Sequence, residues 1–270
     1  MTKRSMQFTY ADKTALVTGA STGIGAVFAQ ELAQRGCSLI LTARSQDRLN
    51  LLAHQLQQQY KINTWVIPAD LQQPAAVADL IQAIQGQAQP VDILVNNAGF
   101  STQGAFHTID PEQEAALIQV NVAALVALTH AFLPGMVERR SGLVVNVASV
   151  LGFYPLPYQA VYSASKAFVR SLTEALWAEY QGSGVQFFAL CPGPTATEFF
   201  QRMGKDLRMQ KMSPEAVVRF AFRAMERGAP WGIPGWQNRL LSGWLPAMTP
   251  RPWLLKQLAQ VSRRLYDISG

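Results

Sequence analysis

The chain has 270 residues, of which 49% are hydrophobic, and this is enough to bury the core of one α/β domain. It has no run of about 18 apolar residues, and its N-terminus lacks the apolar segment of a secretion signal, so we expect neither a membrane-spanning helix nor secretion. Two isolated cysteines and three histidines show no disulfide or metal-ligand spacing, which indicates buried thiols in a cytoplasmic protein without a metal.

The formal net charge of +6 is unevenly distributed along the chain. Residues 1–199 contain 11 lysines and arginines against 13 aspartates and glutamates, whereas residues 200–270 contain 12 against 4. The positive charge is therefore a property of the C-terminal part. We expect no nucleic-acid binding, because no nucleic-acid-binding motif accompanies this charge.

The first expected strand, residues 15–18, leads directly into a glycine-rich turn, and a helical pattern follows as far as Gly36. A strand, a glycine turn and a helix N-terminus together suit a phosphate, because free backbone N–H groups point at the anion. Glycine is needed there because a Cβ would keep the backbone away from a pyrophosphate. The alternative is an ordinary tight turn. The candidate phosphate-binding residues are Gly19, Ser21, Thr22, Gly23, Ile24 and Gly25.

A second expected strand, residues 38–43, ends at Arg44, where a dinucleotide site would face the adenosine ribose. An acidic residue there would accept a bond from a free 2′-hydroxyl, whereas Arg44 and Arg48 suit a 2′-phosphate through charge-assisted bonds. These arginines therefore predict NADP(H) as the cofactor. The alternative is that both are solvated and that Ser45 caps the next helix.

Two further strands are expected over residues 64–68 and 92–95, each followed by a polar turn. Asparagines in such a turn are explained by a loop role alone, because their side chains bond neighbouring backbone groups. A long helical stretch over residues 112–137 then carries Asn121 in an apolar neighbourhood. A buried asparagine within a helix needs partners, so Asn121 is either a structural core residue or holds a water molecule.

The stretch 146–166 begins as a strand, breaks at Gly152 and enters a helical pattern that carries Tyr162 and Lys166. These two side chains are four positions apart and so lie on one face of the helix. An ammonium beside a phenol favours the phenolate and lowers the tyrosine pKa from about 10. Ser149, at the end of the strand, is placed to bond a carbonyl oxygen near the phenol. A lone Tyr-x-x-x-Lys pair is usually an ordinary helix face.

The last expected strand covers residues 185–190 and runs into the turn C-P-G-P-T-A-T. Ser213, Pro214 and Glu215 then open a helix as N-cap, first helical residue and first-turn acid, and Gly228 closes it. Strands alternate with helices about six times, without repeats or linkers. This predicts an α/β fold, a doubly wound parallel sheet in a single domain with helices on both faces and the site at the carboxyl ends of the strands.

Six motifs stand in one order: T-G-A-S-T-G-I-G, N-N-A-G, the helical Asn121, Ser149, Y-S-A-S-K and P-G-P-T-A-T. That order resembles the short-chain dehydrogenase/reductase superfamily over roughly residues 10–235. The resemblance implies a Rossmann fold, and residues 236–270, beyond the resemblance, form a hydrophobic and basic C-terminal extension of the same domain. It also implies an enzyme that moves hydride from NADPH to a ketone or aldehyde.

The resemblance assigns a role to each motif. Tyr162 is the general acid/base, Lys166 binds the nicotinamide ribose and lowers the Tyr162 pKa, Ser149 holds the substrate carbonyl, and Asn121 positions water in a proton relay. The glycine loop, with Ser21, Thr22 and Ile24, looks like the pyrophosphate site. The remaining expected cofactor contacts are Asp70 and Leu71 at adenine, Asn97, Ala98 and Gly99 on the adenosine side, and Pro192, Gly193, Thr195 and Thr197 at the nicotinamide carboxamide.

Two other functions fit the same motifs. A 3-oxoacyl-carrier-protein reductase is one, because the basic segment after residue 200 suits an acidic carrier protein. A catalytically idle NADP(H)-binding or sensing protein is the other, although the intact Asn121, Ser149, Tyr162 and Lys166 argue against it. In the resembled family the two helices around residues 112–137 and 158–180 commonly meet a second subunit, so we expect a homodimer or homotetramer.

The C-terminal part is rich in large apolar and basic residues. Residues 199–212 suit an adaptable apolar lid over the site. Residues 236–268 interleave tryptophans and leucines with arginines and a lysine. This segment either packs over the substrate cleft or a neighbouring subunit, or forms a peripheral membrane contact. Either arrangement predicts a hydrophobic substrate.

Overall fold

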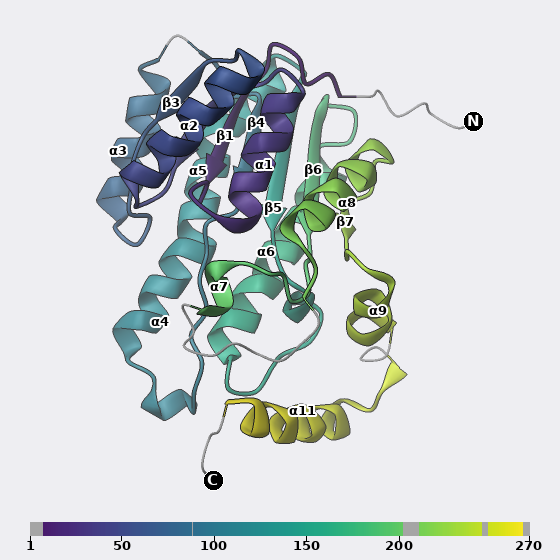
Figure 1. Ribbon diagram of the computed structural model, residues 1–270. Coiled ribbons are helices and arrows are strands. Elements are labelled where there is room, and N and C mark those ends of the chain that lie inside the picture. Colours follow the sequence, from purple (N-terminus) through teal and green to yellow (C-terminus); the bar gives the residue numbers. More distant parts are fainter. Residues whose placement is uncertain (1–7, 88, 202–210, 245–247, 267–270) are drawn as a thin grey trace, which may run out of the picture.

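The centre of the molecule is a parallel sheet of seven strands (Figure 1). We analysed it in a computed structural model, which describes residues 8–87, 89–201, 211–244 and 248–266. The strands are β1 (Thr14–Thr18), β2 (Ser38–Thr42), β3 (Thr64–Val66), β4 (Ile93–Asn96), β5 (Gly142–Val147), β6 (Val185–Leu190) and β7 (Trp231–Gly232). Their order across the sheet is β3-β2-β1-β4-β5-β6-β7. Because the order reverses between β1 and β4, a crevice is expected at the carboxyl ends of these strands.

Helices cover both faces of the sheet, as the sequence predicts. One face carries α1 (Gly23–Gln34), α2 (Gln46–Tyr60) and α8 (Pro214–Glu226), and the other carries α3 (Pro74–Gln85), α5 (Leu125–Glu138) and α6 (Ala160–Glu179). The expected fold class is confirmed. The shorter elements are η1 (Phe106–Thr108), α4 (Pro111–Ile118), η2 (Gln119–Ala124), η3 (Val150–Gly152), α7 (Glu198–Gln201), α9 (Trp236–Arg239), η4 (Leu240–Trp244) and α11 (Arg251–Tyr266).

The alternation of side chains along each strand divides the core into two layers. In β1, Ala15 and Val17 pack with α1, α2 and α8, whereas Leu16 between them packs with α3 and α5. Because successive strand residues point to opposite faces, strands covered on both sides must be apolar throughout. This explains the continuous apolar runs from which the strands were predicted.

Several elements differ from the predictions, and β2 and β3 end at Thr42 and Val66 rather than at residues 43 and 68. Helix α6 begins at Ala160 rather than at residue 158, because Tyr158 has a φ of 68°, which a right-handed helix cannot contain. Strand β7 was not predicted, because two residues give no periodic pattern. The predicted start of α8 is confirmed, since Ser213 Oγ accepts a hydrogen bond of 3.2 Å from the Ala216 N–H.

The helical stretch from Pro111 to Glu138 bears on the expectation that no helix spans a membrane. It is long and apolar enough to do so, with a mean hydropathy of 1.8 over its most apolar 18 residues, and the sequence inspection overlooked it. Half of that window is buried inside the protein, and α5 contacts β4 and β5. A core helix meets the same criteria of length and composition, and the buried half favours that reading.

Candidate active site

The glycine loop after β1 has no room for side chains at two positions. Gly19 has a φ of 63°, and a Cβ there would lie 2.8 Å from Asn97 Nδ2. A Cβ at Gly25 would lie 2.3 Å from the Gly19 carbonyl oxygen, closer than any non-bonded carbon approaches oxygen. Thr22, the N-cap of α1, makes no capping bond with its side chain, so the helix N-terminus is open to an anion. This cradle fits the predicted pyrophosphate.

Thr18 and Asn97 hold this loop against the end of β4. Thr18 Oγ1 accepts the N–H groups of Asn97 and Ala98 at 2.9 and 3.0 Å and donates to the Val95 carbonyl oxygen at 3.3 Å. Asn97 Nδ2 donates to the carbonyl oxygens of Thr18 and Gly19 at 2.9 and 3.1 Å. Asn97 therefore braces two loops at the crevice. The sequence assigned it to the cofactor and gave Thr18 no role.

Tyr162 and Lys166 lie one turn apart on α6, and both are buried. Lys166 Nζ lies 5.8 Å from the centroid of the Tyr162 ring and donates a 2.9 Å hydrogen bond to the Val147 carbonyl oxygen at the end of β5. Burial lowers the pKa of Lys166 from 10.5 to about 8, because the desolvated ammonium is disfavoured. The predicted pair is thus present in a water-poor setting.

Asn121 lies in the π-helical turn η2 and is 2% exposed. Its Oδ1 accepts the Phe100 N–H at 3.1 Å, and its Nδ2 donates to the Phe100 carbonyl oxygen at 3.0 Å and to Ser165 Oγ at 3.1 Å. A Cβ on Gly99 would lie 2.9 Å from Asn121 Oδ1 and 3.4 Å from Lys166 Nζ, so the three residues share one small space. Single π turns within helices often occur at functional sites.

Ser149 directly follows β5 and is the N-cap of η3. Its Oγ accepts the Leu151 N–H at 3.1 Å, which leaves the hydroxyl hydrogen available for another acceptor. The next residue, Val150, donates its N–H to the Pro192 carbonyl oxygen at 3.0 Å. Ser149 is therefore held beside the turn after β6, where the nicotinamide contacts were predicted.

That turn is enclosed by segments far away in the sequence. Gly193 packs on Asn238 of α9, and a Cβ at Gly193 would lie 2.6 Å from Asn238 Nδ2. A Cβ at Gly23 would lie 2.9 Å from Thr197 Cγ2, so the glycine loop and the predicted nicotinamide turn are neighbours. Thr195 is buried and forms a bridge with Met212. The sequence did not indicate Asn238, which lies 45 positions after Gly193.

The two arginines after β2 differ in their partners. Arg48 is exposed and forms an ion pair with Glu198 of α7, at 2.8 and 3.0 Å. Arg44 is also exposed and has no ion pair with any residue that the structure describes. Ser45 is the N-cap of α2 but makes no capping bond with its side chain. At the predicted adenine site, Asp70 Oδ1 accepts the Gln72 N–H at 3.1 Å and Leu71 is buried.

An aromatic side chain lies beside Tyr162, and two tyrosines join the loop before Tyr162 to the C-terminal segment. The ring of Phe199 is 5.9 Å from that of Tyr162, centroid to centroid. Tyr154 hydrogen-bonds Ser242 of η4, and burial raises the pKa of its phenol. Arg263 of α11 donates to the Tyr158 phenol oxygen. The C-terminal segment therefore contacts the loop between Ser149 and Tyr162, whereas the central residues of the predicted lid, 202–210, lie outside the described part.

The sequence analysis missed four residues that shape the site, and three of them carried no local signal. Ser165, Glu198 and Asn238 are revealed by their tertiary partners Asn121, Arg48 and Gly193. Thr18 did carry a signal, since it is a hydroxyl at the end of an apolar strand and next to the glycine turn. A buried hydroxyl at such a place needs a partner, which here is the next loop.

Comparisons with known proteins agree with this geometry. The family described as short chain dehydrogenase matches residues 13–208. A very-long-chain 3-oxoacyl-CoA reductase from Anas platyrhynchos is 33% identical over 256 residues, which span 93% of this chain and 80% of that protein. The structure of a short-chain dehydrogenase from Sphingobium yanoikuyae in complex with NADPH is similar with a TM-score of 0.78 at 33% identity, over 96% of both chains. The bulky-bulky ketone specific alcohol dehydrogenase from Comamonas testosteroni is similar with a TM-score of 0.74 at 30% identity, over 96% of this chain and 95% of that one.

Proposed function

This chain belongs to the short-chain dehydrogenase family, and from that membership we propose that it reduces a hydrophobic ketone or aldehyde with NADPH. Membership makes it an NAD(P)-dependent oxidoreductase that acts on carbonyl and alcohol groups. The observation that carries the finer proposal is the buried pair of Tyr162 and Lys166, which is tied to the carboxyl end of β5 because Lys166 Nζ binds the Val147 carbonyl oxygen, two residues before Ser149. An intact pair of this kind also disfavours a catalytically idle cofactor-binding protein.

In the proposed mechanism, Tyr162 donates its phenolic proton to the alkoxide that forms from the carbonyl. The bound nicotinamide supplies the hydride. Lys166 stabilises the phenolate that remains, and its desolvated charge acts more strongly there than it would in water. One N–H of its ammonium binds the Val147 carbonyl oxygen, which leaves two for the nicotinamide ribose or water.

Two polar side chains complete the mechanism. Ser149 donates its free hydroxyl hydrogen to the carbonyl oxygen and holds it near the phenol. Asn121 fixes the loop at Phe100 and Gly99 against Lys166. The expectation that Asn121 also positions a water stays a prediction, because its amide is already bonded to Phe100 and Ser165.

The proposed preference for NADPH rests on Arg44. Its guanidinium is exposed next to the end of β2 and has no ion pair with the described residues, so it is free to bind a 2′-phosphate. Arg48 is a weaker candidate because Glu198 already neutralises it. The similar Sphingobium yanoikuyae enzyme, solved in complex with NADPH, supports the preference.

A cofactor titration tests this preference. Arg44→Asp should weaken NADPH binding by roughly tenfold to 150-fold, since a charge-assisted bond contributes about 1.5–3 kcal/mol. Arg48→Gln is the matched control and should change NADPH binding much less. Equal affinity of the wild-type protein for NADPH and NADH would contradict the proposal.

A bulky, apolar substrate is supported by the surroundings of Tyr162. The Phe199 ring lies 5.9 Å from that of Tyr162, and the similar proteins act on very-long-chain 3-oxoacyl-CoA and on bulky-bulky ketones by their names. A 3-oxoacyl group on a carrier protein is the alternative substrate form. Comparing free ketones, acyl-CoA thioesters and carrier-bound thioesters by NADPH absorbance distinguishes these substrates.

The experiment that tests the catalytic assignment is Tyr162→Phe. It should lower kcat by at least about 100-fold, the usual scale for loss of general acid catalysis, with little change in NADPH affinity. Tyr180→Phe, just after the other end of α6, is the control and should keep normal turnover. Near-normal turnover by Tyr162→Phe would refute the assignment, and tight NADPH binding without turnover of any carbonyl would favour the idle protein.

We also propose a homodimer or homotetramer assembled through α4, α5 and α6. Ile118 on α4 and Phe168 on α6 are 48% and 42% exposed, and an interface through these helices would cover them. Light scattering at micromolar concentration measures the mass directly. A monomeric mass would contradict this assembly.

A further inference from the structure

Exposed apolar side chains are concentrated in the C-terminal segment. Of the eleven large hydrophobic residues that are exposed in the described part, six lie after residue 235. Trp236 is 74% exposed, Leu241 60% and Trp253 58%. Scattered single apolar residues are normal on a protein surface, but a short segment that exposes two tryptophans and several aliphatic residues indicates a binding surface.

The same segment is purely basic. Residues 227–266 contain six arginines and lysines and no aspartate or glutamate. On α11, the most exposed side chains include Trp253, Lys256, Gln260 and Arg264, which share one face at helical spacing, while Leu254 and Leu258 are partly covered. Within the described residues, Lys256 and Arg264 have no ion pair. A tryptophan and free cations therefore point outward together.

Helix α11 of this basic segment lies at the end of the molecule that carries the candidate active site (Figure 1). Helix α11 runs across the end of the molecule where the strands have their carboxyl ends (Figure 1). Arg263 binds the Tyr158 phenol, and the Tyr158 carbonyl oxygen accepts the Gly104 N–H at 3.0 Å. Phe106, two residues after Gly104, is 70% exposed. Tyr158, in the loop that leads to Tyr162, is therefore bonded both to α11 and to the segment that leads to the exposed Phe106.

We propose that this surface docks on an anionic lipid bilayer, with the end of the molecule that carries the candidate active site facing the lipid. The docking face consists of Trp236, Leu240, Leu241, Trp253, Lys256 and Arg264. Tryptophan and arginine seat in the headgroup region while leucine side chains enter the acyl boundary, and each basic residue adds attraction to anionic lipid. The absence of acidic residues from 227 to 266 favours this partner over a symmetric contact with the same face of a second copy, which would bring the same charge.

Docking in this orientation gives a hydrophobic substrate a path from the bilayer to Tyr162 without passing through water. This consequence rests on the proposed function, whereas docking itself does not. Vesicle binding is measured without turnover. A protein that does not bind vesicles and a protein that does not reduce carbonyl compounds are therefore distinguishable results. Tyr162→Phe should bind vesicles as the wild-type protein does.

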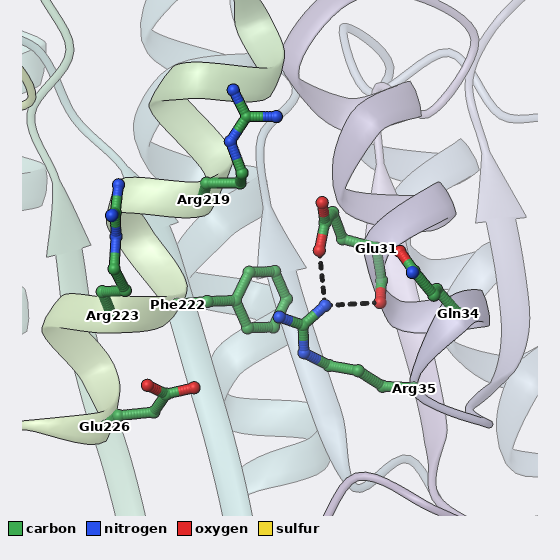
Figure 2. A pocket seen from close by; sticks show the side chains of 7 residues that line it. All are labelled: Glu31, Gln34, Arg35, Arg219, Phe222, Arg223 and Glu226. Atoms are coloured by element: carbon green, nitrogen blue, oxygen red, sulfur yellow. Dashed lines mark hydrogen bonds and ion pairs between the residues drawn. The ribbon is translucent and has the colours of Figure 1, made fainter.

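A groove elsewhere on the molecule provides a matched control (Figure 2). It lies between α1 and α8, has a volume of about 590 Å³ and contains none of the candidate catalytic residues. In it, Arg35 pairs with Glu31 at 2.5 Å and stacks on the Phe222 ring at 3.9 Å. Arg219 and Arg223 are exposed one turn apart on α8. Replacing these two removes as much charge as replacing two cations of the docking face.

The test is flotation of the full chain with vesicles of phosphatidylcholine, with or without phosphatidylserine, at low and at physiological salt. Wild-type protein should bind the anionic vesicles, less strongly as salt rises. Lys256→Gln with Arg264→Gln should weaken binding by roughly 30-fold, which corresponds to about 1 kcal/mol for each charge. Trp236→Ser with Trp253→Ser should abolish it, and circular dichroism checks that each variant is folded.

Several outcomes would overturn the proposal. The first is that the wild-type protein does not float with anionic vesicles at low salt. The second is that Arg219→Gln with Arg223→Gln weakens vesicle binding as much as Lys256→Gln with Arg264→Gln, which would show attraction by net charge alone. A third is a change of oligomeric mass in the tryptophan variants without vesicle binding, which would identify a second copy as the partner. Brominated lipid gives an independent readout, since it should quench fluorescence of the wild-type protein more than that of the tryptophan variants.

Discussion

The glycine loop and the C-terminal segment both lie near the candidate active site, and they are held in opposite ways. The loop from Thr18 to Gly25 is fixed by buried hydrogen bonds and by glycines with no space around them. In the C-terminal segment, residues 236–244 and 248–266 expose large apolar side chains and are joined to the loop before Tyr162 by polar contacts such as Tyr154 with Ser242.

This difference separates the part of the site that binds the cofactor from the part that meets the substrate. A cradle for a constant pyrophosphate gains from being rigid, because binding then loses little conformational freedom. A wall with few buried contacts opens locally at small free-energy cost. We therefore expect substitutions at the glycine loop to affect folding and cofactor binding, and substitutions in the C-terminal segment to affect substrate binding and surface association.

The largest effect is expected from Gly25→Ala. The new Cβ would lie 2.3 Å from the Gly19 carbonyl oxygen and 2.4 Å from Asn97 Nδ2, so the loop must move away from β4. Overpacking against backbone of this kind costs about 3 kcal/mol or more. Chemical denaturation should show this loss of unfolding free energy, together with loss of NADPH binding.

Gly86→Ala is the control for that experiment. Gly86 follows α3 with a φ of −70°, and the nearest atom to its Cβ would be the Gln82 carbonyl oxygen at 3.4 Å. Alanine there should be neutral or slightly stabilising. If Gly25→Ala were as stable as Gly86→Ala, the loop would not be rigid and the contrast between the two regions would fail.

The next effect is a pH dependence caused by Lys166. Its pKa is lowered from 10.5 to about 8 by burial, so between these values the unfolded chain binds more protons and stability rises with pH. Below about pH 8 the desolvation cost is fully present, and above 10.5 it is gone. Relative to Lys166→Met, the wild-type protein should gain roughly 3 kcal/mol across this window.

Denaturant unfolding of both proteins at several pH values measures that difference. The comparison is best made in a Cys191→Ala background, because Cys191 interacts with Lys166 and burial raises its thiol pKa to about 12. Other titrating groups are common to both proteins and cancel. A difference that stays constant from pH 7.5 to 10.5 would show that Lys166 is hydrated, against the water-poor site inferred here.

The sequence predicted the catalytic and cofactor-binding motifs of this site better than the long-range contacts that enclose them. The strands over residues 15–18 and 185–190 and the turn after each were found within a residue, because apolar runs that end in glycine or proline are local signals. The contacts of Gly193 with Asn238 and of Arg48 with Glu198 join residues 45 and 150 positions apart. Periodicity and caps carry no information on such pairs, so the structure was needed to find them.

A smaller effect is expected from a pair of threonines that face each other in the sheet. Thr18 of β1 and Thr42 of β2 are partners in register, and both are buried. Thr18 Oγ1 accepts two backbone N–H groups, whereas Thr42 Oγ1 has no hydrogen-bond partner among the described residues. Thr18→Val should therefore cost about 1–3 kcal/mol, and Thr42→Val should be neutral or stabilising. Equal losses on urea denaturation would show that the hydroxyl of Thr18 is not the brace.

The smallest effect is expected where Tyr154 meets Ser242, because this single neutral hydrogen bond joins η4 to the loop after Ser149. Tyr154→Phe and Ser242→Ala should each cost about 1 kcal/mol of unfolding free energy, and the double variant should cost no more than the larger single loss, since both remove the same bond. Cofactor affinity should stay unchanged, because the braces of the glycine loop are elsewhere. The KM for substrate should rise in all three variants, because the loop between Ser149 and Tyr162 is then less firmly held. If NADPH affinity fell as much as substrate affinity, the two regions would be coupled, and the division between a rigid cofactor cradle and a loosely attached substrate wall would be wrong.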